Sequence, residues 1–117
     1  MMIEIPDIED IPYIVAYETT KIKHHTTSRF VTRLVNISIP RKAGIYFLYD
    51  KINRLLYIGQ TADLLQRISN HRKSINPYYI KYFICEKSKS YRLGIEHILI
   101  DKYQPFLQLF SKERERG

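Results

Sequence analysis

Cysteine and tryptophan are nearly missing from this chain of 117 residues, which has one cysteine and no tryptophan. The single cysteine, Cys85, excludes an internal disulfide and a metal site built from several thiolates. It lies in the apolar run 82–85, which favours a small buried side chain over a nucleophile. Without tryptophan, the ten tyrosines must supply most of the large amphipathic surface.

Long apolar runs are absent as well. No stretch approaches the roughly 20 apolar residues that a membrane-spanning helix requires. The acidic start, MMIEIPDIED, lacks the basic region and apolar core of a signal peptide. We therefore expect a soluble protein of the cytoplasm or nucleoid that is not secreted and has no membrane partner.

Charge is distributed unevenly along the chain. Residues 1–20 contain five acidic residues and no Lys or Arg, although the whole chain carries a net charge of +7. The basic remainder favours a polyanionic partner such as nucleic acid, but a solvated basic surface explains the charge alone equally well. Two further roles stay open for the acidic residues 1–20. They could form the binding surface of an interaction protein, or they could fold over the basic part of the chain as an internal mimic of DNA.

The pattern predicts one α+β domain with extensions at both ends. The three parts are an N-terminal extension that is acidic at its start (1–40), the domain (41–110) and a charged tail (111–117). Within the extension, residues 13–17 favour a strand and residues 24–28 a loop. Residues 30–39 fit a helix and a strand about equally.

Aromatic and branched residues predict three strands in the domain. These strands span residues 44–49, 55–58 and 78–86. A polar turn joins the first two into an antiparallel hairpin. Thr61 and Ser90 are the expected N-caps of two helices, the second ending near Tyr103. We expect a small three-stranded antiparallel sheet flanked by these helices.

Glu96 occupies an unusual place on the second expected helix, inside a broad apolar arc of the helical wheel. Burying a lone carboxylate is costly, so it must be protonated, paired or bound to a cation. A salt bridge to Arg92, one turn earlier, or to another basic group is the structural alternative. The functional alternative is a hard divalent ion such as Mg²⁺, which takes oxygen ligands and often uses only one or two protein carboxylates.

Arg67 and His71 lie four residues apart on the first expected helix and therefore share a face. That face borders the apolar stripe, so its side chains can reach across the edge of the sheet. A planar guanidinium suits a phosphate because it donates two parallel hydrogen bonds. An ordinary exposed helix face is the alternative.

Two tripeptides, Gly-Ile-Tyr at 44–46 and Tyr-Ile-Gly at 57–59, frame the expected hairpin. This pair resembles the GIY-YIG nuclease family, which is named after it. The family continues into a helix that carries an arginine and often a histidine one turn later, here Arg67 and His71. It then places a metal-binding glutamate on a later helix, where this chain has Glu96.

The resemblance covers about residues 39–108 and has two departures. Gln60 stands where some members have a lysine that assists catalysis. Gln108 stands where the family usually has an asparagine after a proline, here Pro105. The five central residues are retained, but these departures keep open a catalytically weak or inactive nucleic-acid-binding module, or an interaction protein on the same fold.

The resemblance implies a divalent-metal-dependent endonuclease that hydrolyses phosphodiester bonds in DNA. The implied catalytic residues are Tyr46, Tyr57, Arg67, His71 and Glu96. Glu96 would hold one Mg²⁺ or Mn²⁺, which stabilises the phosphate and the leaving oxygen, and Arg67 would bind the non-bridging oxygens. Tyr57 or Tyr46 would orient or deprotonate the attacking water, with nearby cations favouring the phenolate.

Basic and amide side chains around the two tripeptides are expected to follow the phosphates without reading bases. The expected nucleic-acid contacts are Lys42, Lys51, Arg54, Arg72, Lys73 and Gln108. The part of the chain outside the resemblance is too short for a large recognition domain. We therefore expect weak sequence preference, a preference for branched or structured DNA, or target choice through a protein partner or homodimer.

Overall fold

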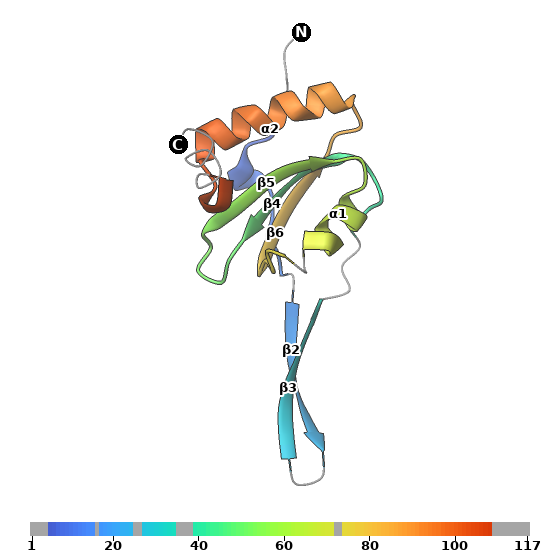
Figure 1. Ribbon diagram of the computed structural model, residues 1–117, viewed down its shortest axis with the longest axis vertical. Coiled ribbons are helices and arrows are strands. Elements are labelled where there is room, and N and C mark those ends of the chain that lie inside the picture. The colour runs from blue at the N-terminus through green and yellow to red at the C-terminus, as the bar shows by residue number, and fades with distance from the viewer. Residues whose placement is uncertain (1–4, 16, 25–26, 35–38, 72–73, 109–117) are drawn as a thin grey trace.

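A four-stranded sheet with one helix on each face forms the body of the protein, and a two-stranded ribbon extends away from it (Figure 1). The computed structural model describes residues 5–15, 17–24, 27–34, 39–71 and 74–108. In chain order the elements are the short 3₁₀ helix η1 (Ile8–Asp10), β1 (Ile14–Val15), β2 (Tyr17–His24), β3 (Thr27–Leu34), β4 (Gly44–Tyr49), β5 (Leu55–Thr61), α1 (Leu64–His71), β6 (Tyr79–Ile84) and α2 (Lys89–Tyr103). The strand order of the sheet is β1-β6-β4-β5, and all neighbours are antiparallel.

The central strand β4 is buried along its whole length and separates two halves of the core. Successive side chains of a strand point to opposite faces of the sheet. Ile45 and Phe47 pack on the face covered by α2, whereas Tyr46 and Leu48 pack on the face covered by α1. The predicted α+β fold is confirmed, with the three predicted strands as the β6-β4-β5 part of the sheet.

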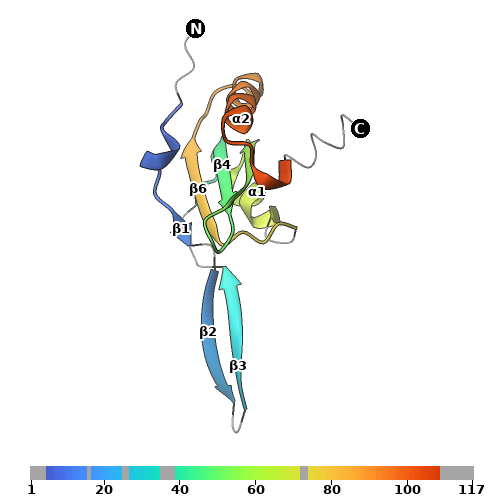
Figure 2. The same ribbon diagram turned by 90° about the vertical axis from the view of Figure 1, so that its left-hand side faces the viewer.

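Part of the expected N-terminal extension belongs to this body. β1 pairs with β6 as a short edge strand, and Ile8 of η1 joins the core on the α2 face. Lys81, which is itself buried, donates a hydrogen bond from Nζ to the Ile8 carbonyl at 2.8 Å. The acidic residues Asp7, Glu9 and Asp10 therefore lie at the β1–β6 edge, and they do not cover the opposite β5 edge (Figure 2).

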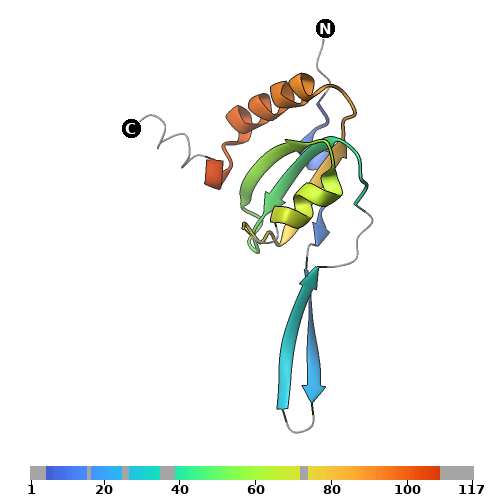
Figure 3. The same ribbon diagram turned by 45° about the vertical axis from the view of Figure 1, so that its right-hand side comes forward.

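The ribbon of β2 and β3 accounts for most of the remaining extension (Figure 3). Its register runs from Tyr17 opposite Leu34 to His24 opposite Thr27. The expected loop at 24–28 is therefore wrong at His24, Thr27 and Ser28, because cross-strand pairing continues through these polar residues. The division of the chain at residue 40 stays a prediction.

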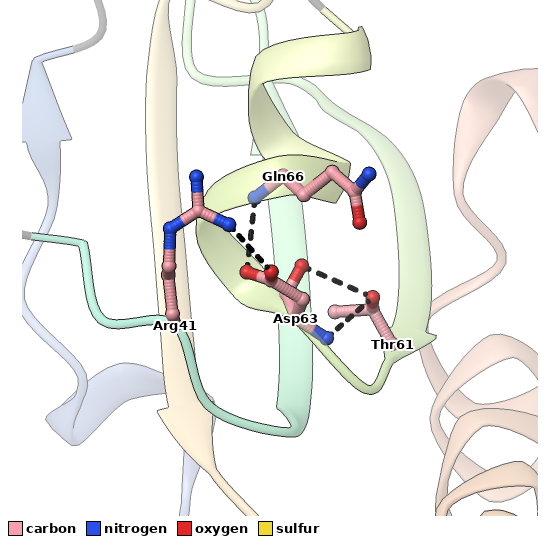
Figure 4. A network of polar contacts seen from close by, with 4 residues as sticks. All are labelled: Arg41, Thr61, Asp63 and Gln66. Atoms are coloured by element: carbon pink, nitrogen blue, oxygen red, sulfur yellow. Dashed lines mark hydrogen bonds and ion pairs between the residues drawn. The ribbon is translucent and has the colours of Figure 1, made fainter.

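The start of α1 is fixed by a small polar network (Figure 4). Asp63 is the N-cap, since its Oδ1 accepts the Gln66 N–H at 3.1 Å. Thr61 was the expected cap, but β5 continues through it, and its hydroxyl oxygen accepts the Asp63 N–H at 3.0 Å. Arg41 adds an ion pair to Asp63 Oδ2 at 3.1 Å. The predicted cap is thus wrong by two residues.

The second helix also begins earlier than predicted. Ser88 is its N-cap, because the Ser88 hydroxyl accepts the Tyr91 N–H at 3.2 Å, and Ser90 lies inside the first turn. The helix ends at Tyr103 as predicted, and Gln104 follows with a left-handed φ of 48°. Among the helices that the structure describes, none is long and apolar enough to cross a membrane.

Candidate active site

Three aromatic rings from three elements meet on the α1 face of the sheet. They belong to Tyr46 of β4, Tyr57 of β5 and His71 at the end of α1. The tyrosine rings stack with centroids 6.1 Å apart, and the His71 ring lies 5.3 Å from Tyr46 and 5.0 Å from Tyr57. The hairpin therefore brings the two tyrosines together, and α1 adds the histidine to the same cluster.

Gly59 makes room for the Tyr46 hydroxyl. The two residues stand opposite each other in the β4–β5 register. A Cβ at Gly59 would collide with the Tyr46 hydroxyl and ring. Tyr46 is completely buried, and a close-packed core leaves its ring no free space to move into. The glycine of the second tripeptide thus keeps the phenol within reach of His71.

We expect Gly59→Ala to lower both stability and any activity that depends on this cluster. Overpacking a core by one methyl group typically costs about 1–3 kcal/mol. The displaced Tyr46 ring would also lose its contact with His71. Thermal unfolding and single-turnover cleavage measure the two effects, and a variant as stable and active as the wild type would contradict the steric role of Gly59.

A chain of hydrogen bonds joins Arg67, Tyr46 and His71. The Tyr46 hydroxyl lies 2.7 Å from His71 Nε2. Burial, together with the charge of Arg67, lowers the pKa of His71 and favours the neutral imidazole. The hydrogen bond to Tyr46 raises the pKa of Arg67. The Tyr46 hydroxyl oxygen therefore accepts from the guanidinium, which has no acceptor, and its second hydrogen bond is shared with His71 Nε2.

Tyr46 is the less suitable of the two tyrosines to act as a base. Burial raises the pKa of its hydroxyl well above the ordinary value, and the hydrogen bond from Arg67 offsets this only in part. Nearby cations were expected to lower the pKa and favour the phenolate. At Tyr46, desolvation raises the pKa by more than Arg67 lowers it. Tyr57 is only half-buried, so its hydroxyl is the more accessible to water.

Glu96 reaches the end of β5 from the opposite face of the sheet. Burial raises the pKa of its carboxyl, while the backbone N–H of Gln60 and the positive charge of Arg67 act in the other direction. The expected alternative was a salt bridge to Arg92. Instead, Arg92 donates from Nε to Gln60 Oε1 at 3.0 Å and from Nη1 to the Lys87 carbonyl. Neither of the ion pairs formed by the described residues includes Glu96.

Glu96 is the candidate metal ligand. No group of three His, Cys, Asp or Glu side chains gathers in the part of the chain that the structure describes. Mg²⁺ keeps several waters and is often held by one or two carboxylates together with substrate phosphates. A half-buried carboxylate beside Arg67, without an ion-pair partner among the described residues, fits that kind of ion.

The expected nucleic-acid contacts that the structure describes lie at different places on the sheet. Lys51 and Arg54 lie in the turn between β4 and β5, at the far end of the strands from α1, and Arg54 is ion-paired with Asp50 at 2.9 Å. Lys42 is exposed just before β4, at the end of the sheet where α1 begins. Two further contacts fall outside the described residues: Arg72 and Lys73.

Gln108 binds the exposed backbone of β5. Its Nε2 donates to the Ile58 carbonyl at 2.6 Å, and the Ile58 N–H donates to its Oε1 at 2.9 Å. The side chain thus pairs with the strand edge as a neighbouring strand would. It supports β5 between Tyr57 and Gly59, and its contact with nucleic acid stays a prediction.

Sequence reasoning missed the role of Gly59 and the contact of Arg92 with Gln60. The glycine of the second tripeptide and the arginine in the first turn of α2 were the visible signals. The side chains that these residues contact come from other elements. Their roles could therefore be recognised only once the fold placed those elements next to one another.

Comparison with known proteins finds similarity in the part of the chain that contains this cluster. A family model described as the GIY-YIG catalytic domain matches residues 42–115. UvrABC system protein C of Mycoplasma genitalium is 29% identical over 84 residues, which is 63% of this chain and 14% of the relative. The same-named protein of Rickettsia rickettsii is 29% identical over 87 residues, 66% of this chain and 14% of the relative. The chain thus spans about one seventh of the length of these relatives.

Proposed function

Because the chain belongs to the GIY-YIG nuclease family, we propose that it is a divalent-metal-dependent endonuclease that hydrolyses phosphodiester bonds in DNA. One observation carries this proposal: five chemically suited side chains from β4, β5, α1 and α2 converge around the end of β5. They are Tyr46, Tyr57, Arg67, His71 and Glu96.

In the proposed reaction, Arg67 binds the non-bridging oxygens of the scissile phosphate. Its side chain is exposed, while its hydrogen bond to Tyr46 orients the guanidinium. A preoriented donor stabilises the charge that develops in the transition state without having to reorganise. Tyr46 therefore acts as a positioning residue for Arg67, and the buried His71 positions the Tyr46 hydroxyl in turn.

Tyr57 orients the attacking water and, as the phenolate, takes its proton and becomes the neutral phenol. Its half-buried ring is held between Tyr46 and His71, so the position of its hydroxyl is fixed. Glu96 would hold the Mg²⁺ or Mn²⁺, which as a Lewis acid would polarise the phosphate and stabilise the leaving oxygen. In this proposal Tyr57 serves the attacking water, Arg67 the phosphate oxygens, and the ion at Glu96 would serve the leaving oxygen.

We expect the protein to nick supercoiled plasmid in Mg²⁺ or Mn²⁺ and to lose this activity in EDTA. Excess Mg²⁺ added after EDTA should restore it, because the ion is held by one carboxylate and exchanges with solvent. Agarose electrophoresis measures the loss of the supercoiled form. Cleavage that continues in EDTA would contradict the role of the metal, and folded protein that cleaves neither plasmid, branched DNA nor RNA would contradict the nuclease.

A nucleic-acid-binding module without catalysis is the second candidate. It is favoured by Gln60, which offers no positive charge and whose Oε1 is engaged by Arg92. Salt-sensitive DNA binding by the wild type without cleavage of any tested substrate would support it.

Target choice is proposed to come from outside this domain or from the shape of the DNA. The relatives carry the name of one component of the UvrABC system and are about seven times longer than the matched part. A protein partner, a homodimer or a branched DNA substrate would each supply the missing selectivity. Comparing cleavage of linear and branched duplexes, with the mass of the protein in solution, separates these alternatives.

A further inference from the structure

A basic cleft lies beside the catalytic cluster, between the end of β5, α1 and the start of α2. It has a volume of about 420 Å³, within the range of ordinary ligand sites. Of the described residues that line it, three are cationic, Arg67, Lys89 and Arg92, and none is acidic. Two amides on one face of α1, Gln66 and Asn70, complete the polar wall.

Arg92 is the unusual member of this cleft. Its side chain is only 8% exposed. The hydrogen-bond partners found for its guanidinium are neutral oxygens, Gln60 Oε1 and the Lys87 carbonyl, and it belongs to neither ion pair of the described residues. A buried charge is normally paired. A guanidinium has five N–H donors, so Arg92 can serve a ligand in the cleft as well.

On the basis of the proposed function, we propose that this cleft binds the DNA phosphate next to the scissile one, through Lys89 and Arg92. Arg67 belongs to both the cleft and the catalytic cluster. An anion in the cleft is therefore an immediate neighbour of the phosphate at Arg67. The pairing of a forked guanidinium with an ammonium is well suited to a phosphate, whose charge compensates for that of Arg92.

The start of α2 strengthens this site. Lys89 is the first residue of that 15-residue helix, whose N-terminus carries a partial positive charge. The cleft therefore combines a helix terminus, a buried arginine and an exposed lysine. Lys42, Lys51, Arg54 and Gln108, the expected phosphate-following contacts that the structure describes, do not line it, so the cleft adds a contact beyond them.

Binding of a short fluorescent DNA duplex tests the proposal, with Glu96→Gln as the parent so that the duplex stays intact. Adding Lys89→Ala should reduce the slope of log K against log salt by about 0.9, because one phosphate contact is lost. Lys102→Ala, an exposed lysine on the last turn of the same helix, is the matched control and should leave the slope unchanged. Lys89 is chosen because Arg92 is buried and its removal endangers the fold.

A chemical double-mutant cycle locates the contact. Replacing the phosphate beside the mapped nick with a neutral methylphosphonate should weaken binding several-fold for the parent and have little further effect with Lys89→Ala. Equal slopes for Lys89→Ala and Lys102→Ala, or additive effects in the cycle, would overturn the cleft while cleavage by the wild type still upheld the nuclease. A parent that binds no DNA, with a wild type that cleaves none, would overturn both.

Discussion

Replacing Glu96 by glutamine is expected to reduce cleavage at least about a thousandfold, or about 4 kcal/mol of transition-state stabilisation. The amide has nearly the same shape as the carboxylate but removes the negative charge that would hold the divalent ion. Single-turnover cleavage of plasmid in saturating Mg²⁺ measures the loss. Folded Glu96→Gln protein with full activity would contradict the metal assignment.

The same variant should fold at least as well as the wild type at neutral pH. Burial raises the pKa of Glu96 in the folded protein, so its contribution to stability is fully present below the unfolded pKa and is lost as pH rises through the folded pKa. Glutamine does not ionise. The stability of the wild type should therefore fall relative to the variant as pH rises above the ordinary carboxyl range, which thermal unfolding across pH measures. This separates a catalytic defect from misfolding.

The nearest acidic control is Asp101→Asn on the same helix. Asp101 is exposed and lies outside the cluster. Its substitution also removes one negative charge, so it tests whether a loss of activity follows from the overall charge. We expect cleavage within a few-fold of the wild type.

The hairpin and its two tyrosines were predictable from local patterns. The aromatic and branched residues of 44–49 and the short polar turn after them favour an antiparallel hairpin, and that hairpin places Tyr46 beside the strand of Tyr57. The apolar arc of α2 likewise drew attention to Glu96. The hairpin prediction is confirmed because it depends on residues close together in the sequence, and the role of Glu96 stays a prediction.

Contacts between distant segments were not predictable in the same way. The cap of α1 was misplaced because β5 runs on through Thr61, and the length of β5 depends on its pairing with β4. The partner of Arg92 was misidentified because Gln60 comes from another element, 32 residues away. Complete burial of Tyr46 requires α1 to close over it, so its raised pKa could not be inferred from the hairpin alone.

Arg67 is the second residue whose loss should remove most of the activity. We expect Arg67→Ala to lower kcat by about 10²–10³, the usual effect of losing one preoriented donor to the developing charge. Arg67→Lys should recover little of this, because an ammonium cannot donate two parallel hydrogen bonds to a phosphate. Arg41→Ala is the matched control, since its guanidinium is 70% exposed and pairs with Asp63 on the surface. Its ion pair is worth little, so activity should change only slightly.

The form of the Arg67 defect distinguishes its role in the reaction from simple attraction of DNA. If Arg67 acts mainly in the transition state, kcat and kcat/KM fall together and DNA affinity changes little. If it only attracts the phosphate backbone, KM rises while kcat stays near the wild-type value. The KM of the variant then depends less steeply on salt than the KM of the wild type. The hydrogen bond that fixes Arg67 against Tyr46 predicts the first pattern. An unchanged kcat for Arg67→Ala at saturating DNA would therefore contradict a catalytic role for the guanidinium.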